Sequence, residues 1–96
     1  MSLFDLLKAR RNEILQIAAK HGARNVRVFG SAVKSIQRPD SDIDLLVEME
    51  QGRSLIDLVE LNDDLEAILQ RSVDVVTDGG ISPFMKDRIY NEAVPL

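Results

Sequence analysis

Three aspartates interrupt two segments of the sequence that are otherwise apolar and strand-like. Asp42 and Asp44 belong to the stretch Asp-Ile-Asp-Leu-Leu-Val, and Asp74 belongs to Ser-Val-Asp-Val-Val-Thr. Side chains alternate between faces in an extended chain, so Asp42 and Asp44 are expected on one face with about 7 Å between their Cα atoms. Carboxylates this close repel one another, and an apolar segment deprives them of water. Hard divalent cations such as Mg²⁺ bind carboxylate oxygens, so the pair favours a magnesium site.

Gly30 and Ser31 end an earlier apolar run, Val-Phe-Gly-Ser, and have a different chemistry. Glycine at the end of a strand lets the backbone approach a ligand closely, and serine can cap a short helix whose free N–H groups attract anions. We expect a single helical turn from Ser31 to about Ser35. The two residues therefore predict a phosphate-binding turn, which complements a cation that binds phosphates.

Alternation of apolar and polar residues predicts the elements that must position these groups. Turn residues and helix caps separate them. The expected strands are 25–29, 42–48 and 72–77, and the expected helices are 3–21, 54–70 and 83–92. We predict one α/β (α+β) domain over residues 1–96, with a small mixed sheet of about three strands backed by helices.

All three helices carry an apolar stripe that should face the sheet, and in helix 3–21 it is Leu3, Leu7, Ile14 and Ala18, with Leu6 and Ile17 beside them. In helix 54–70 the stripe is Leu55, Leu58, Leu61, Leu65, Ile68 and Leu69, and in helix 83–92 it is Met85, Ile89 and Ala93. The acidic residues of helix 54–70 should form a largely solvated face. His21 is expected to interact with a helix C-terminus, and Tyr90 to pack.

Composition narrows the class of protein. The 96 residues include no cysteine and one histidine, so a metal site must be built mainly from oxygen ligands. The net charge of −4 argues against broad attachment to nucleic acid, which needs a basic face. No apolar stretch approaches the length of a membrane span, and no secretory signal is visible, so a cytoplasmic location is expected.

The order Gly30-Ser31, Asp42-Ile-Asp44 and a later Asp74 resembles the nucleotidyltransferase superfamily that includes the DNA polymerase beta palm. The small size, the stretch Pro-Asp-Ser-Asp-Ile-Asp-Leu-Leu-Val and the ending Asp-Arg-Ile-Tyr-Asn-Glu-Ala-Val-Pro-Leu are similar to the minimal nucleotidyltransferase (MNT) family. The likeness covers nearly the whole chain.

The resemblance implies a role for each matching residue. Gly30, Ser31 and Lys34 would bind the triphosphate of ATP or another nucleoside triphosphate. Asp42, Asp44 and Asp74 would bind Mg²⁺ and form the catalytic triad, with Asp74 helping the second metal or activating the acceptor hydroxyl. Many relatives have Arg-Gly where this chain has Lys34-Ser35. Lysine keeps the charge there but lacks the bidentate fork of arginine.

The resemblance also implies a partner. MNT proteins are commonly antitoxins of helical HEPN toxins, and some transfer AMP to a toxin tyrosine. Three hypotheses follow: an active transferase, a module that neutralises a toxin by binding alone, or a nucleic-acid-binding regulator, for which no basic stripe is visible. A homo-oligomer is also compatible with the sequence. For the residues themselves, Asp42 and Asp44 could instead be a solvent-facing pair, and Lys34 a solvated loop charge.

Overall fold

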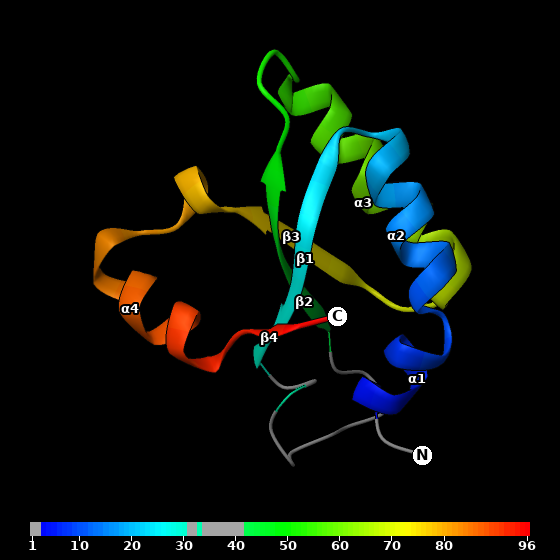
Figure 1. Ribbon diagram of the computed structural model, residues 1–96, viewed down its shortest axis with the longest axis horizontal. Coiled ribbons are helices and arrows are strands. Elements are labelled where there is room, and N and C mark those ends of the chain that lie inside the picture. The colour runs from blue at the N-terminus through cyan, green and yellow to red at the C-terminus, as the bar shows by residue number, and fades with distance from the viewer. Residues whose placement is uncertain (1–2, 31–32, 34–41) are drawn as a thin grey trace.

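The computed structural model describes residues 3–30, 33 and 42–96. Helices and strands follow one another as shown in Figure 1. The helices are α1 (Leu3–Ala9), α2 (Arg11–Lys20), α3 (Leu55–Leu69) and α4 (Pro83–Glu92), and the strands are β1 (Ala23–Phe29), β2 (Ile43–Met49), β3 (Val73–Thr77) and β4 (Val94–Pro95). A 3₁₀ turn, Asp78–Gly80, connects β3 to α4.

The strands form one mixed sheet in the order β3-β2-β1-β4. β1 pairs with β2 and β4 in antiparallel fashion, and β2 pairs with β3 in parallel. The predicted α/β fold with a mixed sheet is therefore confirmed, with one strand more than expected. β4 was missed because it is two residues long and contains Pro95, which a sheet tolerates only at its edge.

The predicted helix 3–21 is in fact two helices that meet at Arg10. Leu3 and Leu7 are buried in α1, and Ile14 and Ala18 in α2. In a continuous helix, Arg10 and Arg11 would both border the buried stripe that contains Leu7 and Ile14, where a charged side chain is unfavourable. The chain bends there instead, and the Arg10 guanidinium donates to the carbonyl oxygen of Ile68 at the end of α3.

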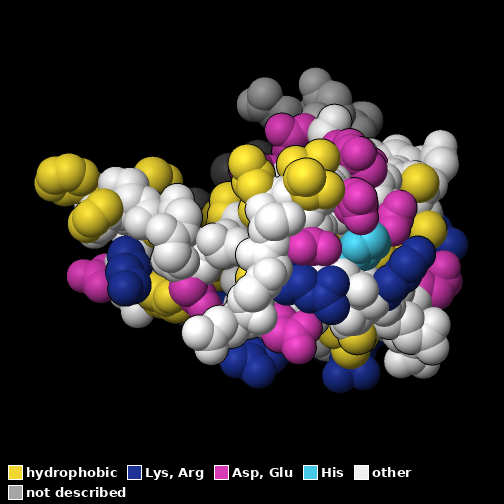
Figure 2. Space-filling view, turned by 90° about the horizontal axis from the view of Figure 1, so that it is seen from above, with side chains coloured by type: hydrophobic (Ala, Val, Ile, Leu, Met, Phe, Trp, Pro, Cys, Tyr) yellow, Lys and Arg dark blue, Asp and Glu magenta, His cyan; other side chains and the backbone are white. Residues whose placement is uncertain are grey.

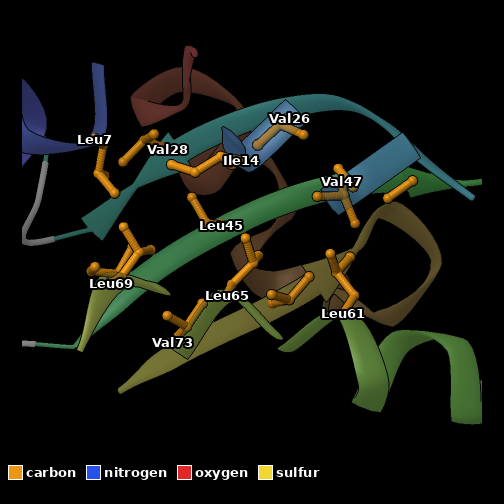
Figure 3. Packing of buried hydrophobic residues seen from close by; sticks show 14 of the residues in the cluster. Leu7, Ile14, Val26, Val28, Leu45, Val47, Leu61, Leu65, Leu69 and Val73 are labelled. Atoms are coloured by element: carbon orange, nitrogen blue, oxygen red, sulfur yellow. The ribbon is translucent and has the colours of Figure 1, made fainter. Parts of the chain in front are cut away.

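The core lies between one face of the sheet and helices α1–α3, which Figure 1 shows together on one side of the sheet. Figure 3 shows the side chains that fill it. They come from all three helices and from β1, β2 and β3, and they include Leu7, Ile14, Val28, Leu45, Leu61, Leu65 and Val73. Fully burying one such side chain contributes about 1.5–3 kcal/mol, so this face fixes the sheet on which the aspartates stand.

Parts of the predicted apolar stripes of α3 and α4 are exposed. In α3, Leu61, Leu65 and Leu69 are buried, but Leu55 is 73% exposed because the first turn of α3 extends past the core. In α4, Ile89 is buried while Met85 is 49% exposed. Figure 1 places α4 on the side of the sheet opposite α1–α3, and in Figure 2 it forms the projection at the left, with apolar side chains at its tip.

The acidic face of α3 is less solvated than predicted. Asp64 accepts a hydrogen bond from the His21 ring, at 2.6 Å, and a Glu66 carboxylate oxygen accepts from the backbone N–H of Val73, at 2.8 Å. These acids therefore attach α3 to α2 and to β3. Within the described ranges, no helix combines the length and hydropathy needed to span a bilayer.

Candidate functional site

Asp44 and Asp74 lie directly opposite each other on neighbouring strands. In the parallel pairing of β2 with β3, Asp44 is the partner of Asp74, and residues paired in this way project to the same face of the sheet. Ile43 and Leu45, which flank Asp44, are buried in the core on the other face. The two carboxylates thus share the sheet face away from α1–α3, Asp44 half-buried and Asp74 exposed.

Asp42 stands just before β2 and contributes to the same electrostatic environment. The pKa of Asp44 is raised from its ordinary 3.8 to about 6, first by burial, then by the negative charges of Asp74 and Asp42. Burial and like charges both disfavour the ionised carboxylate. The structure therefore brings the three aspartates close enough to interact, with Asp44 at the centre of the repulsion.

Gly30 lies against this group from the end of β1. Phe29 pairs with Asp44, and the next residue, Gly30, has a left-handed backbone with φ +73°. A Cβ atom at position 30 would collide with Oδ2 of Asp44. The Gly30 carbonyl oxygen accepts a hydrogen bond of 3.2 Å from the N–H of Val33, so the chain turns immediately after the strand. Glycine is needed here to bring the turn against the carboxylate.

The other predicted phosphate ligands, Ser31 and Lys34, lie outside the described residues. Among the residues that are described, no three histidine, aspartate or glutamate side chains already converge on one point as metal ligands. The donor chemistry nonetheless fits a hard divalent cation: Asp44 and Asp74 offer carboxylate oxygens side by side, and a cation would relieve the repulsion that raises the pKa of Asp44.

His21 is not part of this site. It ends α2 on the opposite side of the sheet and is 6% exposed. Its Nε2 is 2.6 Å from Asp64 Oδ2, and its Nδ1 is 3.8 Å from a carboxylate oxygen of Glu60. The two ring nitrogens face different carboxylates, so the histidine links α2 to α3.

A second polar cluster on the same face as Asp44 was not predicted from the sequence. Arg27 is paired with Leu46 across β1 and β2, and its Nη2 donates to Asp78 Oδ1 at 3.0 Å. Tyr90 of α4 donates its hydroxyl to the same oxygen, at 2.6 Å, and this hydrogen bond is the main cause of its raised pKa. The cluster fastens α4 to the sheet. In the sequence, the one indication of this cluster is Arg27, which lies between Val26 and Val28 and is therefore expected on the sheet face away from the core.

A hollow of about 550 Å³ lies between the end of β2, the start of α3 and the 3₁₀ turn, with Glu48, Leu58 and Asp78 in its wall. Glu48 follows Asp44 by four positions in β2, about 13 Å along a strand. The hollow is therefore separate from the aspartates. We place the chemistry at the aspartates, because the hollow contains no comparable group of interacting carboxylates among its described residues.

Residues 11–96 match the family model of the nucleotidyltransferase domain. A Methanocaldococcus jannaschii chain named as a protein adenylyltransferase is 48% identical over 88% of this chain and 90% of its own length. The protein adenylyltransferase MntA of Thermococcus cleftensis is 34% identical over 93% of this chain and 87% of its own. The chain belongs to the nucleotidyltransferase family, in its minimal form, and is a nucleotidyltransferase.

Solved structures agree with this assignment. A structure named as a minimal nucleotidyltransferase has 45% sequence identity and a TM-score of 0.87, and the match covers 100% of this chain and 97% of that one. A chain of a toxin–antitoxin complex with AMP-PNP has 23% identity and a TM-score of 0.75 over 88% of this chain and 69% of that chain. A tri-AMPylated Shewanella oneidensis HEPN toxin in complex with MNT antitoxin gives 20% identity and a TM-score of 0.70 over 92% of this chain and 69% of that one. The last two show a shared fold.

Proposed function

We propose that this chain transfers AMP from ATP to a tyrosine hydroxyl of a partner HEPN toxin in the cytoplasm, and thereby acts as an antitoxin. The observation that carries the proposal is the pairing of Asp44 with Asp74 on the open face of the sheet, with Asp42 near enough to raise the pKa of Asp44. The names of the relatives support the reaction, and the solved toxin–antitoxin complexes support the class of partner.

In this proposal Asp42, Asp44 and Asp74 hold Mg²⁺. The bound cation would neutralise negative charge on the phosphate oxygens during an in-line displacement at phosphorus. Asp74, the most exposed position of the β2–β3 pair, would accept the proton of the incoming tyrosine hydroxyl. Both carboxylates stand on rigid strands anchored by the core, which keeps their separation fixed.

The phosphate side of the site would begin at Gly30. Its left-handed turn sits against Asp44, so a triphosphate held by the backbone after β1 would have its reacting phosphorus next to the carboxylates. Ser31 and Lys34 remain the predicted side-chain contacts of the triphosphate. Lys34 would act there as a point charge.

The test is a transfer assay with a purified HEPN toxin, ATP and Mg²⁺, in which mass spectrometry locates AMP on the toxin. We expect Asp44→Asn and Asp74→Asn each to lower the rate at least about a hundredfold, since each removes a carboxylate ligand of the Mg²⁺ that would neutralise the transition-state charge. Asp63→Asn, an exposed change on α3, is the matched control and should leave the rate unchanged. Unaltered labelling by both site variants would refute the assignment of these residues.

The alternative is a module that neutralises its toxin by binding alone. The same variants separate the two functions in cells that express the toxin. If the chain acts as a transferase, cells that carry Asp44→Asn lose protection together with the labelling, provided that the variant still co-purifies with the toxin. Protection that survives this substitution would establish the binding module instead.

A further inference from the structure

Tyr90 is the one tyrosine of the chain, and its hydroxyl is already bound to a base. Tyr90 is 37% exposed on α4, and its Oη donates to Asp78 Oδ1 at 2.6 Å. A hydroxyl becomes a nucleophile when a neighbouring group at this distance takes its proton. The Tyr90–Asp78 pair therefore has the geometry of an acceptor hydroxyl with its general base.

Two cations flank the same hydroxyl-bearing ring. The Cζ atom of Arg27 is 5.5 Å from the ring centroid of Tyr90, and the Nζ atom of Lys86 is 5.9 Å from it. Arg27 is largely buried, with 12% of its side chain exposed, and its bond to Asp78 holds it in place. An anionic phosphate that approaches Tyr90 would meet the exposed charge of Lys86, whereas Arg27 is already paired with Asp78.

We propose that Tyr90 is itself an AMP acceptor, modified by a second copy of this chain; the inference rests on the proposed function. Tyr90 Oη attacks the α-phosphorus of ATP bound to the other copy, and the new O–P bond forms as the bond from that phosphorus to the pyrophosphate oxygen breaks. The phenolic proton passes to the Asp78 carboxylate, and pyrophosphate leaves. No oxidant or further reactant is required.

Transfer between copies follows from the position of the pair. Asp78 comes four positions after Asp74, which is about 13 Å along an extended chain. While Tyr90 is bonded to Asp78, its hydroxyl is therefore out of reach of the aspartates of its own sheet. Tyr90 is 37% exposed on α4, where eight of the ten residues are exposed, so the active site of another molecule can approach it.

The experiment mixes two full-length variants that are each inert alone. Asp44→Asn cannot transfer AMP but keeps Tyr90, whereas Tyr90→Phe keeps the aspartates and the ring packing but lacks the acceptor hydroxyl. With ATP and Mg²⁺ the mixture should place AMP on Tyr90 of the Asp44→Asn chain, at a rate proportional to the concentration of Tyr90→Phe. A size difference from an affinity tag identifies the labelled chain, and peptide mass spectrometry identifies the residue.

A second substitution tests the base. Asp78→Asn in the acceptor chain should slow labelling at least about a hundredfold, and Asp87→Asn, at an exposed carboxylate on α4, should leave it unchanged. The chain has no tryptophan and one tyrosine, so an absorbance titration reports Tyr90 alone. The raised pKa of Tyr90 should fall in Asp78→Asn, which verifies that the contact has been broken.

The outcomes distinguish this inference from the proposed function. Label on the toxin with none on Tyr90 would overturn the inference and leave the proposed function intact. Label on other residues of the Asp44→Asn chain would overturn it as well. Absence of label on both the toxin and Tyr90 would overturn both proposals, because the chain would then not transfer AMP to a hydroxyl under these conditions.

Discussion

Replacing Asp44 by asparagine should stabilise the cation-free protein at neutral pH, although it removes a proposed catalytic group. The pKa of Asp44 is about 6 in the folded chain against an ordinary 3.8, a difference worth about 3 kcal/mol between the two protonation states. Solvent reaches part of this half-buried side chain, and screening reduces the effect to about 1–2 kcal/mol. For a domain of this length the corresponding rise in Tm is about 5–10 °C.

The pH dependence has a definite sign. Because the folded-state pKa of Asp44 is raised, the folded state binds more protons than the unfolded state between about pH 4 and 6. The Asp44 contribution to the free energy of unfolding therefore falls as the pH rises through this window. Asp44→Asn lacks this term, so its advantage over the wild type should be full above pH 6 and should vanish below pH 4.

The assay is thermal unfolding in EDTA at pH 4, 5, 6 and 7 for the wild type, Asp44→Asn and the control Asp63→Asn. The control, exposed on α3, should remain within about 0.5 kcal/mol of the wild type throughout. Saturating Mg²⁺ with ATP should raise the Tm of the wild type but not that of Asp44→Asn. An Asp44→Asn protein that is less stable than the wild type at pH 7, or a difference that does not change with pH, would show that burial and the neighbouring aspartates do not destabilise ionised Asp44.

Two further substitutions test the contacts around the sheet. Gly30→Ala should lower the free energy of unfolding by more than Gly52→Ala does. Both positions have positive φ, at +73° and +92°, but only a Cβ at position 30 would collide with Asp44. Denaturant titrations compare the two variants, and equal losses of about 1–2 kcal/mol would contradict the close approach of Gly30 to Asp44. In the same titrations, His21→Ala should lower the free energy of unfolding by about 1–3 kcal/mol, because the Asp64 carboxylate loses its partner at 2.6 Å. An unchanged denaturation midpoint would show that the His21–Asp64 contact between α2 and α3 does not stabilise the fold.

The sequence predicted the fold well wherever one residue pattern determined one element. The predicted start of helix 83–92 is confirmed by α4, before which the Ser82 hydroxyl accepts from the N–H of Phe84 and in which Pro83 is the first residue. Ser54 likewise begins α3, with its N–H donating to Asp57 at 2.8 Å. These are local interactions, so propensity and capping are sufficient to predict them.

Long-range features were harder to predict. The alternation of residues predicted that Asp42 and Asp44 share a face, but the register that places Asp44 opposite Asp74 is set by the whole β2–β3 pairing. The Arg27–Asp78–Tyr90 cluster joins positions far apart in the sequence, so local residue patterns could not predict that these three side chains meet. Leu55 and Met85 fit a helical stripe, yet both are exposed, because a stripe does not tell how much of a helix the rest of the fold covers.

The most direct test of the central claim is a crystal structure of the chain with Mn²⁺ and a non-hydrolysable ATP analogue, read by the anomalous signal of manganese. We predict manganese bound by carboxylate oxygens of Asp44 and Asp74, with the triphosphate beside Gly30. Manganese and nucleotide seated in the hollow beside Glu48 and Asp78, with the Asp44–Asp74 pair unligated, would contradict it.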